Sequence, residues 1–148
     1  MESQFSKREQ VIEVVNKLFV YTDNRQWGKL LDEVFTESVL FDMSSAGGGE
    51  AGTIPAKEIC EKWEKGFEGI DAVHHQAGNY LVTLLDNGEA TVRAYAIAIH
   101  FKKAATRGNT RQFVGNYDLF LSEGPGKGWR ISAFRYNLKF MDGNVDLA

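Results

Sequence analysis

The spacing of apolar residues changes near residue 73 from three and four to two, and this change constrains the fold more than any other feature. Four runs with alternating polarity follow it: 73–85, 89–103, 110–123 and 128–141. Turn-forming residues separate these runs: Asp86-Asn87-Gly88, Arg107-Gly108-Asn109 and 124–128. Helices followed by a long meander predict an α+β fold, with the helices packed on one face of a curved, mostly antiparallel sheet.

The first half of the chain predicts three helices. Ser6 and Glu9 have the spacing of a capping box, and the helical stripe after them runs to about Tyr21. A second short helix begins at Trp27, with Asp23 or Asn24 as its N-cap. A short strand over 38–43 and a glycine-rich loop over 47–52, which is a possible lid, precede a third helix at roughly 55–68.

Composition narrows the class of protein. A chain of 148 residues that is 43% hydrophobic predicts one packed domain over 1–148. Its net charge of -3 gives no basic surface for nucleic acid or an anionic membrane. A small-molecule ligand fits better. The first residues lack the apolar core of a signal peptide, so we expect a cytoplasmic protein. Cys60 is the single cysteine, and its expected role is packing.

Alternation places a line of small residues on one face of the second long strand. Its members are Ala90, Val92, Ala94, Ala96 and Ala98, and the line ends at His100. Small side chains leave room in front of a sheet, so this face either lines a pocket or receives a closely packed helix. In the preceding strand, alternation places His75 on one face with Ala77, Asn79 and Leu81 and turns His74 to the other face, and a one-residue bulge would exchange the two histidines.

An aspartate and two strand-borne histidines are the components of an acid/base site. A neutral imidazole accepts a proton near pH 7, and a carboxylate that takes its Nδ1–H orients it and stabilises the imidazolium. Asp23, at the break between two helices, is placed to do this for His75. The alternatives are that Asp23 only caps the second helix and that the histidines are ordinary packed or exposed residues.

Several segments resemble the SnoaL-like branch of the NTF2-like superfamily, over nearly the whole chain. They are Tyr21-Thr22-Asp23-Asn24-Arg25-Gln26-Trp27, the stretch 31–41 and Trp129-Arg130-Ile131. The resemblance implies a cone-shaped barrel with three N-terminal helices. Within the superfamily, Asp23, His75 and His100 are similar to the Asp/His/His pattern of scytalone dehydratase.

That resemblance implies roles for particular residues. His75, oriented by Asp23, would be the general base and acid, and His100 would assist the leaving group. Asn116 on the third long strand would complete the pocket, and Trp63 would form part of its apolar wall. Thr22 and Met43 fall where the fungal enzyme has carbonyl-polarising tyrosines, so elimination or isomerisation on a more acidic substrate is the reaction type implied.

The leading expectation is therefore a cofactor-independent lyase or isomerase acting on a small cyclic or polyketide-like molecule, with no metal. Asp42 offers a weaker comparison with ketosteroid isomerase, since Val14 or Val15 stands where that enzyme has a tyrosine. The alternative from another class is a non-catalytic binding or assembly module. A homo-oligomer, dimer or trimer, is expected through an exposed sheet face: Tyr95, Ile97, Ile99 and Phe101.

Overall fold

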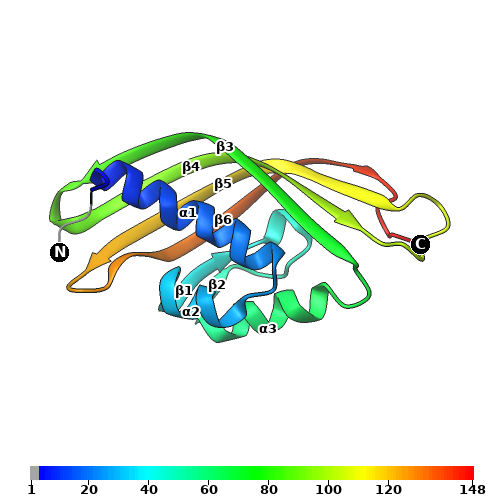
Figure 1. Ribbon diagram of the computed structural model, residues 1–148, viewed down its shortest axis with the longest axis horizontal. Helices are drawn as coiled ribbons and strands as arrows, with labels where there is room; N and C mark the ends of the chain where they lie inside the picture. Colours follow the sequence, from blue (N-terminus) through cyan, green and yellow to red (C-terminus); the bar gives the residue numbers. More distant parts are fainter. Residues whose placement is uncertain (1–3) are drawn as a thin grey trace.

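The structure is a computed structural model and describes residues 4–148. Three α-helices lie in the first half of the chain, and long strands fill the second half (Figure 1). The helices are α1 (Lys7–Asp23), α2 (Trp27–Glu33) and α3 (Ala56–Gly66), with short 3-10 turns at η1 (Ser44–Ala46) and η2 (Asp86–Gly88). The strands are β1 (Phe35–Asp42), β2 (Gly52–Pro55), β3 (Ala72–Leu85), β4 (Glu89–Phe101), β5 (Thr110–Gly124) and β6 (Gly128–Gly143).

The strands form one curved sheet in the order β2-β1-β6-β5-β4-β3. Neighbouring strands are antiparallel except β1 and β6, which run parallel. The edge strands β2 and β3 do not pair with each other, so the predicted barrel is an unclosed, mixed sheet. The predicted α+β class, with three helices packed on a curved sheet, is confirmed.

Helix α1 begins as the sequence predicts. The Ser6 hydroxyl accepts from the Glu9 N–H at 3.1 Å, and the Glu9 carboxylate accepts from the Ser6 N–H at 3.2 Å. Its apolar stripe is buried, from Val11 to Thr22. Burial of each large apolar side chain favours folding by about 1.5–3 kcal/mol, so this stripe holds α1 against the sheet. Among residues 4–148, no helix is long and apolar enough to cross a membrane.

The predicted capping role of Asp23 is wrong. Helix α1 continues through Asp23, and α2 begins only at Trp27, with Gln26 as its N-cap and no side-chain capping bond. Arg25 takes a left-handed φ of 54° between the two helices. The two further residues of α1 leave Asp23 at the end of one helix rather than at the start of the next, and its carboxylate reaches β3.

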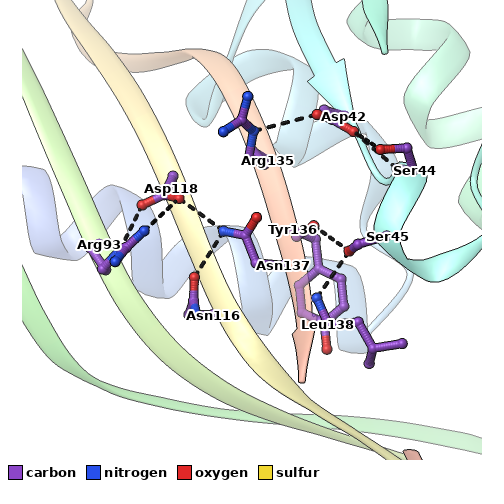
Figure 2. A network of polar contacts seen from close by, with 10 residues as sticks. All are labelled: Asp42, Ser44, Ser45, Arg93, Asn116, Asp118, Arg135, Tyr136, Asn137 and Leu138. Atoms are coloured by element: carbon purple, nitrogen blue, oxygen red, sulfur yellow. Dashed lines mark hydrogen bonds and ion pairs between the residues drawn. The ribbon is translucent and has the colours of Figure 1, made fainter. Parts of the chain in front are cut away.

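The predicted glycine-rich loop over 47–52 lies between two ordered elements. Its last residue, Gly52, begins strand β2 (Gly52–Pro55), which pairs with β1, and Pro55 then precedes α3. The turn η1 before the loop is bonded to β6, because Ser45 Oγ donates to the Tyr136 carbonyl at 2.7 Å and accepts from the Leu138 N–H at 2.9 Å (Figure 2). Residues 47–51 form the loop between these two elements.

The two faces of β4 separate as the alternation predicts. The line of small residues from Ala90 to His100 is buried, whereas Tyr95, Ile97 and Phe101 are exposed on the outer face. Strand β3 keeps the predicted phase only as far as Gly78. Asn79 then takes a φ of 55° at a break in register, so Tyr80 packs on the core and Leu81 is exposed. The bulge lies after His75, which leaves His75 on the inner face.

Candidate active site

A cavity of about 200 Å³ lies between the helices and the inner face of the sheet. Most of its wall is apolar. Its lining residues are Leu18, Phe19, Thr22, Met43, Ala46, Trp63, Phe67, His75, Ala96, Ala98, His100, Phe113, Tyr117, Phe134 and Tyr136. An apolar cavity of about 150 Å³ is large enough for one benzene molecule, so this cavity accommodates a single substituted ring or a molecule of similar size.

Asp23 and His75 are joined by two hydrogen bonds. The Nδ1 of His75 lies 2.5 Å from Asp23 Oδ1, and the backbone N–H of His75 donates to Asp23 Oδ2 at 2.8 Å. A carboxylate can only accept, so Nδ1 of the neutral imidazole carries the proton and Nε2 keeps its lone pair. No hydrogen bond joins Nε2 to another described residue, and the His75 ring lines the cavity. Nε2 is therefore available as a base.

Packing fixes the orientation of this pair. The ring of Phe19 stacks on the His75 ring, with centroids 5.3 Å apart and an angle of 28° between the planes. Only 11% of the His75 side chain and 13% of the Asp23 side chain are exposed. His74 points to the other side of β3 and is exposed. Of the two neighbouring histidines, His75 is the one at the cavity.

His100 is buried and also has a defined tautomer. The Nε–H of Arg111 donates to its Nδ1 at 3.1 Å, and because a guanidinium only donates, the His100 proton resides on Nε2. Burial, helped by the nearby charge of Arg111 and by His75, lowers the pKa of His100 to about 4. His100 therefore offers the cavity a neutral N–H donor near pH 7. Phe67 and Phe113 pack around its ring.

The other residues predicted from the resemblance divide into two groups. Thr22, Met43 and Trp63 line the cavity. The Thr22 hydroxyl is occupied, because it donates to the Leu18 carbonyl at 2.5 Å. Trp63 packs against the aromatic side chains of Phe41 and Phe134 and forms part of the wall.

Asn116 does not line the cavity, so its predicted place in the pocket is wrong. It shares a face with Asp118, as the alternation predicts, but that is the outer face of β5. There the Asn137 amide donates to Asn116 at 2.9 Å and to Asp118 at 2.8 Å, and Arg93 pairs with Asp118 (Figure 2). Tyr117, one residue along, is the residue that faces the cavity.

Asp42 lies outside the cavity as well. Its carboxylate accepts from the Ser44 hydroxyl at 2.6 Å and from the Ser44 N–H at 3.0 Å, and it pairs with Arg135 (Figure 2). The bonds to Ser44, more than the charge of Arg135, hold the pKa of Asp42 below its usual value. The structure therefore gives no support to Asp42 as a general base.

Three polar residues at this site are not among those predicted from the sequence. Tyr117 and Tyr136 line the cavity from β5 and β6, and the Nε–H of Arg111 donates to His100 Nδ1. The alternation along β5 and β6, which decides which residues face inward, is the sequence signal that predicts the two tyrosines. The pairing of His100 with Arg111 depends on the register between β4 and β5. Among residues 4–148, no group of three or more metal-binding side chains comes together.

Comparisons with known proteins agree with this architecture. Residues 3–135 match the SnoaL-like domain, so the chain belongs to the SnoaL-like domain family. It is similar to the Kfla4162 protein from Kribbella flavida, with 25% identity, a TM-score of 0.86 and 95% of each chain covered. No curated protein matches the chain.

Two further solved structures share the fold at lower identity. A "Putative Scytalone Dehydratase" from Novosphingobium aromaticivorans is 14% identical, with a TM-score of 0.77, over 92% of this chain and 86% of that one. An NTF2-like superfamily protein from Salmonella enterica is 15% identical, with a TM-score of 0.72, over 93% and 94%. The predicted NTF2-like fold is confirmed.

Proposed function

We propose that the protein is a cofactor-independent lyase or isomerase that removes a proton from carbon in a small cyclic or polyketide-like molecule. The observation that carries this proposal is the double contact of Asp23 with His75. A carboxylate that only capped a helix would bond to backbone N–H groups of that helix and not to an imidazole. Here it sets the His75 tautomer that leaves a basic nitrogen at an apolar cavity.

The proposed reaction begins with proton transfer to His75 Nε2. The substrate C–H bond breaks, its electron pair moves into the substrate, and the imidazolium that forms is stabilised by Asp23. In an elimination, the electron pair then expels a β-hydroxyl, which takes the proton from His75 and leaves as water. In an isomerisation, the proton returns to another carbon. Both reactions need only the side chains at this site.

His100 is proposed to bind the polar end of the substrate. Its neutral Nε2–H, set by Arg111, donates a hydrogen bond to a leaving oxygen or to an oxygen that gains charge. Since burial keeps its pKa near 4, it does so without competing with His75 for the proton. This division between a base and a neutral donor is a typical acid/base arrangement.

The likeness to a protein titled a putative scytalone dehydratase supports the proposal of an elimination. The alternative is a binding module that uses the same apolar cavity without catalysis. The two proposals differ in one elementary step, since only an enzyme exchanges substrate C–H protons. We also propose that the protein is cytoplasmic and a homo-oligomer, and that it works without a metal or cofactor.

The test is carbon-bound hydrogen exchange. A panel of single-ring ketones and β-hydroxyketones is incubated with the protein in D₂O and followed by NMR. We expect deuterium incorporation or dehydration by the wild type, loss of it in His75→Gln, and no change in Asp42→Asn, which alters a carboxylate outside the cavity. Undiminished exchange by His75→Gln would rule out the proposed base.

A further inference from the structure

Tyr136 brings a buried hydroxyl without a hydrogen-bond partner to the cavity. Its side chain lines the cavity from β6 and is 3% exposed. No atom of the described residues forms a hydrogen bond with its hydroxyl. Buried polar groups are almost always paired in proteins, so such a group calls for a partner that arrives from outside the chain.

The surroundings hold this hydroxyl in place. The Tyr136 ring packs on its cross-strand neighbour Tyr117, with centroids 4.8 Å apart. The Tyr136 carbonyl and the Leu138 N–H are both hydrogen-bonded to Ser45 of η1 (Figure 2). Gly115 lies beneath the hydroxyl, and a Cβ at that position would come within 2.8 Å of its oxygen. Glycine therefore leaves the space that the phenol occupies.

The hydroxyl is chemically suited to donate. Burial raises the pKa of Tyr136 to about 12, so the phenol is neutral near pH 7. Trp129 has the other buried polar atom without a partner among residues 4–148, but it does not line the cavity. The cavity thus has several neutral donors beside one base, His75: the His100 Nε2–H, the Tyr136 O–H and the phenol of Tyr117, whose pKa burial also raises.

We propose that the Tyr136 hydroxyl binds the acceptor oxygen of the ligand, supplying from β6 the phenol that is missing at Thr22 and Met43. This inference rests on the proposed function and narrows it to carbonyl compounds. As His75 takes the α-proton, the C–H electron pair forms a C=C bond and the carbonyl becomes an enolate. Tyr136, with His100, donates to the enolate oxygen, which gains negative charge in that step.

A phenolate is a stable mimic of such an enolate oxygen, and 4-nitrophenol reports its own ionisation by its absorbance. We expect the wild type to bind this probe as the phenolate slightly below neutral pH. Tyr136→Phe keeps the ring and should weaken binding by about tenfold to a hundredfold, as expected for one hydrogen bond to a charged group. Tyr95→Phe, on the exposed outer face, is the matched control and should bind like the wild type.

Two further measurements keep the proposal open to refutation. Without probe, Tyr136→Phe should melt no lower than the wild type, because the hydroxyl has no bond to lose. In the wild type, the ring signals of labelled Tyr136 should shift when the probe binds. Equal binding by Tyr136→Phe, unshifted ring signals, or no binding of phenol or 4-nitrophenol by the wild type would each overturn the inference.

The experiment separates this inference from the proposed function. His75→Gln removes the base but not the donors, so it should still bind the phenolate. If the probe depends on Tyr136 while no substrate exchanges deuterium, the donor site stands and the catalytic proposal fails. If deuterium exchange depends on His75 while probe binding does not depend on Tyr136, the catalytic proposal stands and the donor site fails.

Discussion

The carboxylate of Asp23 binds His75 at two points, with Oδ1 2.5 Å from Nδ1 and Oδ2 2.8 Å from the backbone nitrogen. One contact orients the ring, and the other fixes the strand that carries it. Because the last residue of α1 makes both contacts, helix and sheet cannot shift against each other without disturbing the imidazole. The geometry of the base is therefore tied to the packing of α1.

Asp23→Asn should keep the fold but disturb the tautomer of His75. An amide still accepts from the backbone N–H, but its NH₂ group donates and favours a lone pair on Nδ1. We expect nitrogen NMR to show a single Nδ1–H tautomer in the wild type and a mixed or reversed one in the variant. Proton exchange on substrate should fall by roughly 10²-fold or more. An unchanged tautomer together with full activity would contradict the orienting role.

His100 should make stability depend on pH. Its pKa falls from 6.5 to about 4 on folding, so between these values the unfolded chain binds more protons. The contribution of His100 to the free energy of unfolding is therefore complete above pH 6.5. It decreases by about 3 kcal/mol as the pH falls towards 4. Urea unfolding across this range should show the slope, and His100→Gln should reduce it. An equal slope in both proteins would mean that His100 titrates normally in the folded state.

Arg111 is expected to act as a positioning residue through His100. Arg111→Lys keeps the positive charge but lacks the planar Nε–H that donates to Nδ1. We expect His100 to populate both tautomers in nitrogen NMR, while His75 keeps its own. The effect on substrate exchange should appear mainly in kcat, because the donor is lost from the step in which charge develops. A His100 spectrum identical to that of the wild type would refute this role.

Gly115→Ala tests the close packing beneath Tyr136. The added methyl would collide with the Asn137 carbonyl oxygen and crowd the Tyr136 hydroxyl. Overpacking of this kind costs about 1–3 kcal/mol, which thermal or urea unfolding will resolve. Gly28→Ala in α2 is the matched control, since nothing lies within 4 Å of the new methyl. It should be neutral or stabilise the helix by up to about 1 kcal/mol; equal effects of the two variants would contradict the packing argument.

The outer face of the sheet predicts self-association. Tyr95, Ile97 and Phe101 are exposed side by side along β4. We expect light scattering to give the mass of a dimer or trimer, and Ile97→Asp to reduce it to that of a single chain. Val20→Asp, at an exposed position of α1, should leave the mass unchanged. A wild type that stays monomeric at high concentration would remove this expectation.

Much of the fold follows from local sequence. The capping box at Ser6, the helical stripe after it and the alternating runs from residue 73 each predict an element that the structure contains. These signals are local, because propensity and periodicity act over a few residues. The bulge at Asn79 and strand β2 were missed, since each depends on a partner strand distant in the sequence.

The site, like the fold, depends partly on local sequence and partly on tertiary contacts. The sequence by itself determined that two strand-borne histidines, His75 and His100, follow Asp23 at a helix end, and that small residues precede His100 on β4. Only the tertiary structure decided that Asp23 turns to His75 rather than to the next helix, that Arg111 sets the His100 tautomer, and that Tyr136 rather than Asn116 reaches the cavity. The reason is physical: hydrogen bonds and cavity walls form between strands and helices far apart in the chain, so their partners are chosen by register, by which sheet face is inward and by packing.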